Sequence, residues 1–234
     1  MTFFLIMIIP SYEIYKNTNP IKNGKKNIYK RYNKFLNWLE EYYCKPLNIY
    51  CDILREKYGR ITIILKSEND LIKYNISKNN IFRIKKSVKK KILKKFKELV
   101  KEPIFKNIYD DQEYNFLEET ELIVCTFENI SKIVTIDKIK KNEIKKLLKD
   151  INNPELWIIS RLLSYTTFFV FTEKQLKKYK NDKITIQDWT KKYMEIIKHY
   201  DEYGYFKKEY KIKLDSKENF DTNYNSNWYY YHYK

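Results

Sequence analysis

The chain has 234 residues, of which 43% are hydrophobic and 33% are charged, and this composition excludes a disordered or largely membrane-embedded protein. Only three residues are glycine, so neither a phosphate-binding glycine loop nor a dinucleotide-binding fingerprint can be built. The common nucleotide-binding enzymes are therefore excluded, and we expect no cofactor.

The formal net charge of +17 has two expected sources. A strongly basic protein attracts anionic partners such as nucleic acids and acidic proteins. However, alanine is absent, only five residues are arginine, and lysine, isoleucine, asparagine and tyrosine are abundant. These preferences follow A/T-rich codons. We therefore expect a biased genome to explain part of the charge and an anionic partner to explain the rest.

The three cysteines, Cys44, Cys51 and Cys125, include no closely spaced pair, and their odd number leaves one without a disulfide partner. Free thiols are typical of a reducing compartment, so we expect a cytoplasmic protein. The apolar segment 2–9 is too short to span a bilayer and lacks the charged start and cleavage site of a signal peptide. Because Pro10 ends it, the segment predicts a buried strand.

The N-terminal half predicts helices around a central hairpin. Pro20 lies in a polar stretch without clear periodicity, and Gly59 stands between two strand-like runs, where its freedom to adopt a positive φ predicts a tight turn. We expect, in order, an irregular connection over 11–26, a helix over 27–43, strands over 47–54 and 60–67, a helix over 80–101 and a strand over 122–127.

In the C-terminal half, the run after Pro154 predicts a short helix that changes at Tyr165 into a buried strand, and Thr172 predicts a helix N-cap. The tail "NWYYYHY" carries aromatic side chains at alternate positions and predicts a closing strand. The other expected elements are helices over 140–151, 173–180 and 186–203, a strand over 209–215 and a turn over 225–227.

The mixed order of helices and strands predicts a single α+β domain over residues 1–234. We expect a mixed or mostly antiparallel sheet that contains the N-terminal strand, the central hairpin and the C-terminal aromatic strand. Several amphipathic helices are expected to pack against this sheet.

Few residues suit catalysis, and this scarcity favours a non-enzymatic protein. Only two residues are histidine, so histidine-based catalytic sites have few candidates. Asp215, Glu218 and Asp221 would share a face if their stretch were helical, and three such acids together can hold Mg²⁺ or Ca²⁺. Hydrogen-bonded turn formation explains the same residue types, so we expect no metal and keep these three as weak candidates.

The segment from Lys78 to Glu102 holds eleven basic and two acidic residues, which is a net charge of +9. Its apolar residues follow one helical stripe, so the lysines occupy the remaining face. This face is either a solvated surface of a lysine-rich protein or a binding surface. The candidate partner- or nucleic-acid-binding residues are Lys85, Lys86, Lys89, Lys90 and Lys94 on this helix, with Trp228, Tyr229 and Tyr231 in the tail.

Two functional hypotheses follow. In the first, the chain is a non-enzymatic interaction protein, of antagonist or immunity type, whose basic helix and aromatic residues bind a protein partner with an acidic surface. In the second, the same lysines contact phosphates and the tail aromatics stack on the bases of a nucleic acid. A metal-dependent hydrolase or nuclease that uses the acidic cluster is a third alternative.

Overall fold

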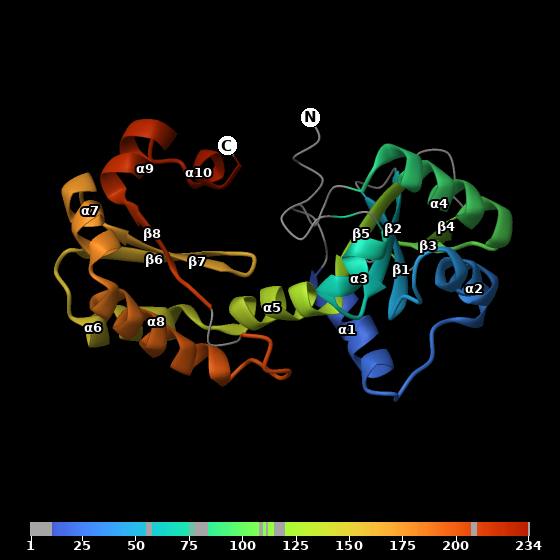
Figure 1. Cartoon of the computed structure of the whole chain (residues 1–234), viewed down its shortest axis with the longest axis horizontal. Helices are drawn as coiled ribbons and strands as arrows, with labels where there is room; N and C mark the ends of the chain where they lie inside the picture. The colour runs from blue at the N-terminus through green and yellow to red at the C-terminus, as the bar shows by residue number, and fades with distance from the viewer. Residues whose placement is uncertain are drawn as a thin grey trace. The chain divides into compact units, whose positions relative to one another are not determined.

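The computed structural model describes residues 11–54, 58–74, 76, 84–107, 110, 112–114, 120–206 and 210–233. By their contacts, the residues form two compact units, Met1–Ile130 and Ser131–Lys234, and each unit has its own β-sheet (Figure 1). The predicted α+β class is confirmed, with the strands divided between two sheets. A single domain over 1–234 stays a prediction, and the expected strand over 2–9 lies outside the described residues.

The first unit is built on a mixed five-stranded sheet in the order β4-β3-β1-β2-β5. The predicted central hairpin is confirmed, because β1 and β2 pair antiparallel, whereas β3 and β5 run parallel to their neighbours β1 and β2. In chain order the unit contains α1 (Ser11–Lys22), the 3₁₀ helix η2 (Lys30–Tyr32), α2 (Asn33–Tyr42), β1 (Asn48–Leu54), β2 (Tyr58–Leu65), α3 (Glu68–Lys73), α4 (Lys86–Leu99), β3 (Phe105–Lys106), β4 (Glu113–Tyr114) and β5 (Glu121–Thr126).

The two faces of this sheet differ in polarity. Ile49 of β1 belongs to an apolar cluster that also contains Phe35 of α2 and Phe96 of α4, so these helices cover one face. The neighbouring residue Asn48 points to the opposite face, since side chains alternate along a strand, and there its amide donates to Thr18 of α1 at 3.0 Å. The α1 side of the sheet therefore contains a buried polar layer.

Residues 11–22 form the helix α1, so the expected irregular connection is wrong for this stretch. Pro20 lies inside the last turn, where the helix ends two residues later, and the following Gly24 adopts a positive φ of 69°. Ile14 and Thr18, four residues apart, are both fully buried. Packing of this helical face onto the sheet therefore outweighs the weak local signal.

Gly59 is needed for a reason other than the expected turn geometry. It lies inside β2 opposite Ile53, and it is not among the described residues with a positive φ. A Cβ atom at this position would lie 2.6 Å from the ring of Phe105 in β3. Glycine therefore permits the ring to pack directly against the backbone of β2.

The second unit is built on a three-stranded sheet in the order β6-β7-β8, with β6 and β7 antiparallel and β7 and β8 parallel. Residues of α6, α7 and α8 share one apolar cluster with one face of this sheet, and α9 and α10 pack on the other face. Figure 1 shows α6 and α8 on one side of the sheet and α9 and α10 on the other. The elements are α6 (Lys141–Ile151), β6 (Leu156–Leu162), β7 (Tyr165–Val170), α7 (Glu173–Asn181), α8 (Lys183–Lys198), β8 (Lys213–Ser216), α9 (Lys217–Tyr224) and α10 (Trp228–Tyr233), and α5 (Phe127–Lys138) runs across the boundary between the units.

Two expectations for this unit are wrong. The run after Pro154 is the strand β6, because its β-branched and aromatic residues pair with β7 over Leu156–Leu162. The aromatic tail is the helix α10 rather than a closing strand, and the amide N–H of Tyr231 donates to the carbonyl of Asn227 in a helical bond of 3.0 Å. In a helix, Trp228 and Tyr231 lie on one face and pack against the sheet together, which a strand would not allow.

Candidate functional site

The lysines of α4 form a stripe on the exposed side of the first unit. The helix is confirmed, with Ile92 and Phe96 buried against the core. The exposed stripe repeats every three or four residues, so successive lysines stand about 6 Å apart along the helix axis or slightly closer. We call this the α4 lysine stripe, and it consists of Lys86, Lys90, Lys94 and Lys97.

The five predicted lysines do not share one environment. Lys89 is half-buried, and its ammonium group lies 2.7 Å from a carboxylate oxygen of Glu121 in β5. Within the described residues, the lysines of the stripe have no such carboxylate partner, and Lys85, at the N-cap, is also exposed. Lys89 therefore anchors α4 to the sheet, whereas Lys85, Lys86, Lys90 and Lys94 keep their charge in solvent.

Two aromatic side chains of α2 lie beside α4, a proximity to its lysines that no sequence pattern indicates. The ammonium group of Lys91 lies 4.5 Å from the ring centre of Tyr42 and 5.9 Å from that of Trp38. The two rings are one helical turn apart, with centres 5.2 Å from each other, and Tyr42 is 51% exposed. The α4 face therefore combines solvated cations with accessible aromatic surface.

The tail aromatics belong to the second unit, whereas the predicted lysines belong to the first. The ring of Trp228 lies 4.2 Å from that of Phe220 and 5.4 Å from that of Phe169, and Tyr231 joins the same cluster. Of the three predicted residues, only Tyr229 is exposed, whereas Trp228 and Tyr231 are half-buried. The structure thus gives Trp228 and Tyr231 a packing role, and a stacking role for the three residues stays a prediction.

Each carboxylate of the acidic cluster faces donors of its own. Asp215 accepts hydrogen bonds from Asn219 and from the hydroxyl of Tyr231, at 2.8 and 2.6 Å. Glu218 accepts from the backbone N–H of Glu173, and Asp221 pairs with Lys217. No group of three potential metal ligands occurs among the residues that the structure describes. These acids therefore hold α9, α10 and the start of α7 in place.

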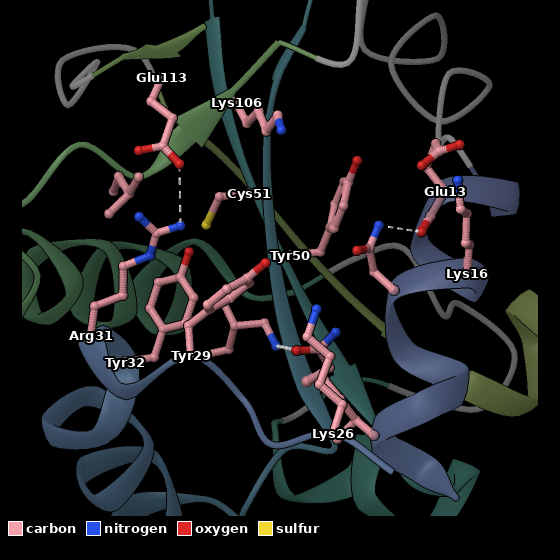
Figure 2. A pocket seen from close by; sticks show the side chains of 15 residues that line it. Glu13, Lys16, Lys26, Tyr29, Arg31, Tyr32, Tyr50, Cys51, Lys106 and Glu113 are labelled. Atoms are coloured by element: carbon pink, nitrogen blue, oxygen red, sulfur yellow. Dashed lines mark hydrogen bonds and ion pairs between the residues drawn. The ribbon is translucent and has the colours of Figure 1, made fainter. Parts of the chain in front are cut away.

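A pocket of about 480 Å³ opens in the first unit, at one edge of β1 (Figure 2). Within the described part of the chain, β3 pairs with β1 at a single position, Asp52 opposite Lys106. The residues of β1 before Asp52 are therefore not paired with β3, and this edge of the strand borders the pocket. α1 forms one wall, and the segment from Lys26 to Tyr32 forms another.

Cationic side chains reach the pocket from four separate segments: Lys16 of α1, Lys26 of the loop after it, Arg31 of η2 and Lys106 of β3. Two carboxylates, those of Glu13 and Glu113, also line it. The lining therefore carries four positive and two negative charges, an excess of two positive charges. No sequence motif marks this site, because its residues are spread over a hundred positions.

Arg31 is held firmly in the pocket wall. Its guanidinium donates to the backbone carbonyl of Pro103 at 2.9 Å and lies 3.8 Å from the carboxylate of Glu113. It also lies over the rings of Tyr29 and Tyr32, 5.1 and 5.5 Å from their centres. This arrangement leaves Arg31 little freedom, so it shapes the wall and neutralises Glu113.

The floor of the pocket contains hydroxyl and thiol groups in their neutral forms. Burial raises the pKa of Cys51 to about 12, so its thiolate is scarce at neutral pH and the thiol is a poor nucleophile. Burial, with the nearby charge of Asp52, also raises the pKa of Tyr50. The side chain of Tyr50 extends from β1 into the pocket as a neutral hydrogen-bonding group (Figure 2). The site is therefore equipped to bind an anion.

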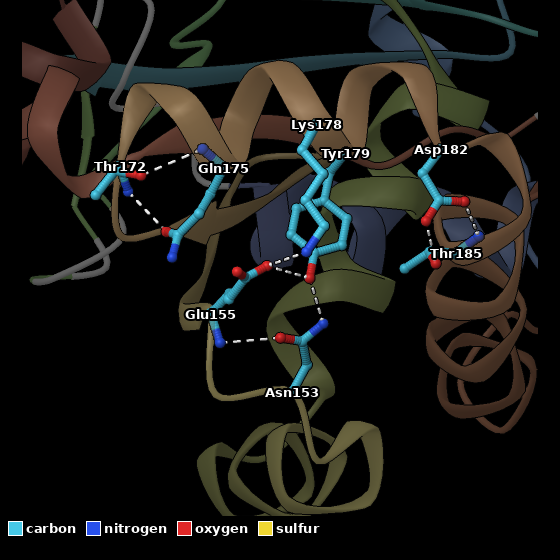
Figure 3. A network of polar contacts seen from close by, with 8 residues as sticks. All are labelled: Asn153, Glu155, Thr172, Gln175, Lys178, Tyr179, Asp182 and Thr185. Carbon is cyan, nitrogen blue, oxygen red and sulfur yellow. Dashed lines mark hydrogen bonds and ion pairs between the residues drawn. The ribbon is translucent and has the colours of Figure 1, made fainter.

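A polar network in the second unit has a structural explanation (Figure 3). The carboxylate of Glu155 accepts from Lys178 at 2.8 Å and from the hydroxyl of Tyr179 at 2.7 Å, and these bonds fasten the start of β6 to α7. Thr172 caps α7 as predicted, accepting from the backbone of Gln175. Because each group already serves a cap or a connection, we assign no ligand to this network.

No protein-family model, curated protein or solved structure matches this chain. None of the helices in the described ranges has the length and apolar character needed to cross a bilayer. The functional assignment therefore depends on the residues themselves.

Proposed function

We propose that the protein binds nucleic acid through the α4 face of its first unit. The observation that carries the proposal is the α4 lysine stripe together with the neighbouring Lys91, whose ammonium group lies over the half-buried ring of Trp38 and the exposed ring of Tyr42. The lysines would contact successive phosphates, and the rings would offer stacking surface to unpaired bases. A cationic track beside aromatic side chains is typical of proteins that bind single strands.

A protein partner with an acidic surface is the competing proposal, and it would use the same lysines. Tyrosine and tryptophan also suit protein interfaces, and the spacing of the lysines along one helix, which matches a row of phosphates, is what favours a nucleic acid. The three free and buried cysteines support a reducing compartment such as the cytoplasm for either activity.

Fluorescence anisotropy with a labelled single-stranded oligonucleotide tests the proposal. The logarithm of the binding constant should fall steeply with the logarithm of the salt concentration. Replacing the four stripe lysines by glutamine should reduce this slope by roughly 3, because each phosphate contact to a single strand contributes about 0.7. A variant with Lys145, Lys149, Lys174 and Lys177 changed to glutamine has the same net charge and should keep the wild-type slope.

Two single substitutions refine the assignment. Tyr42→Ala should weaken binding about tenfold at constant salt slope, since a stacked base contributes roughly 1–3 kcal/mol. Lys89→Gln should change the slope less than Lys90→Gln, because Lys89 is paired with Glu121. Equal slopes for the two quadruple variants would contradict the proposal. Salt-insensitive binding, or binding only to an acidic protein, would also contradict it.

A further inference from the structure

We propose that the pocket at the edge of β1 is a separate binding site for a small phosphomonoester, such as a sugar phosphate or a nucleoside monophosphate. This inference concerns a different set of residues from the α4 stripe and does not depend on it. The cavity of about 480 Å³ lies within the size range of small-molecule sites, which is roughly 300–1,000 Å³.

Charge selects the phosphoryl group. The lining has an excess of two positive charges, and a phosphomonoester carries close to two negative charges at neutral pH. Besides the pair of Arg31 with Glu113, the lining contains Lys16, Lys26 and Lys106 and one further carboxylate, that of Glu13. In the residues that the structure describes, neither Lys16 nor Lys26 has a carboxylate partner. Both ammonium groups are therefore available to a phosphate.

The remaining polar groups select a hydroxylated ligand. Tyr50 presents a neutral phenol that can donate to a phosphate oxygen. Glu13, on the same wall as Lys16, can accept a hydrogen bond from a sugar hydroxyl. An acceptor beside cations fits a molecule with both an anionic and a hydroxyl end, and an inorganic anion would leave Glu13 unpaired.

The walls are positioned before any ligand enters. Arg31 is fixed by Pro103 and Glu113, and Asn48 in the floor bonds both Thr18 and the backbone N–H of Ile49, at 3.0 and 2.8 Å. The Asn48 side chain thus satisfies a backbone donor of β1 and ties α1 to the strand. A site whose walls are held in this way loses little conformational entropy on binding.

Isothermal titration calorimetry on the whole chain tests the site with four compounds: AMP, ribose 5-phosphate, inorganic phosphate and adenosine. AMP and ribose 5-phosphate should bind at least about tenfold more tightly than adenosine, and their ratio distinguishes a nucleotide from a sugar-phosphate ligand. Inorganic phosphate should bind more weakly than the esters. Equal binding of inorganic phosphate and the esters would overturn the assignment, because it would show a general anion site.

Substitutions of the pocket lysines test whether the esters bind at this site. The double variant Lys16→Gln with Lys26→Gln should weaken binding of the esters at least about tenfold and leave the melting temperature of the free protein unchanged. The matched double variant Lys145→Gln with Lys149→Gln, and the four-lysine variant of α4, should bind as the wild type does. Unchanged affinity in the Lys16/Lys26 variant, or no ester binding at millimolar concentration, would overturn the proposal. Neither result would affect the oligonucleotide titration, so the two proposals fail independently.

Discussion

Arg60 in β2 and Asp52 in β1 stand directly opposite each other in the first sheet and form a fully buried ion pair. The Nε of Arg60 donates to one carboxylate oxygen of Asp52 at 2.8 Å, and a second guanidinium nitrogen contacts the other oxygen. Asp52 is also the residue at which β3 joins β1. The ion pair therefore lies at the junction of β1, β2 and β3, in the sheet whose edge borders the pocket.

Removing one partner of this pair should strongly destabilise the first unit. Asp52→Asn leaves a guanidinium buried without its counter-charge, and we expect a loss of about 3–5 kcal/mol in the free energy of unfolding, measured by urea denaturation. Asp188→Asn breaks the exposed pair with Lys192 and should cost no more than about 1 kcal/mol. Similar losses in the two variants would show that burial does not determine the effect.

Gly59→Ala should destabilise the same unit by about 1–3 kcal/mol, because the new methyl group overlaps the buried ring of Phe105. A smaller side chain in place of Phe105 should relieve this overlap. In a double-mutant cycle, Phe105→Leu combined with Gly59→Ala should therefore cost less than the sum of the single substitutions. Additive losses of stability would show that Gly59→Ala acts through the β2 backbone rather than through overlap with Phe105.

Substitutions at two neighbouring positions of α10 distinguish a role in packing from a role in binding. Trp228→Ala removes a ring that contacts Phe220 and Phe169, and this half-buried site should lose about 2 kcal/mol in urea denaturation. Tyr229→Ala changes an exposed side chain and should stay within about 0.5 kcal/mol of the wild type. If Tyr229→Ala weakens oligonucleotide binding while Trp228→Ala does not, the exposed side of α10 contributes to the function.

These results indicate which parts of the molecule can be predicted from the sequence. The helix α4 follows from the helical spacing of its apolar residues, and the β1–β2 hairpin follows from two strand-like apolar runs, which are buried along most of their length. Helix α1 and the tail do not follow from such local patterns, because Pro20 and a run of tyrosines oppose the helix that tertiary packing selects. In both cases, contacts with distant residues decide the local structure.

The two candidate sites also differ in how far the sequence predicts them. The α4 lysines are visible as a charge run in one helix, although the sequence does not reveal that Lys89 is paired with Glu121 in a strand thirty-two residues away. The pocket depends on the meeting of α1, β1 and β3, and neither Lys16 nor Lys106 belongs to a recognisable motif. Only the three-dimensional arrangement brings such residues together.

The last prediction concerns pH and the imidazole of His232 in α10. This ring stacks on Trp228 with centres 5.6 Å apart, and burial lowers its pKa below the ordinary value of 6.5. Because the unfolded chain then binds the proton more readily than the folded one, the stability that depends on neutral His232 is present above the unfolded pKa. As the pH falls below about 6.5, this stability is lost progressively until the folded pKa is passed.

The melting temperature of the wild type should therefore fall between pH 7 and pH 5. His232→Phe keeps an aromatic ring against Trp228 but removes the titrating group, so its melting temperature should fall less over the same range. The carboxylates of the unit that titrate at lower pH, such as Glu155 and Asp221, are present in both proteins and cancel in the comparison. Parallel pH profiles for the two proteins would show that protonation of His232 is not coupled to unfolding.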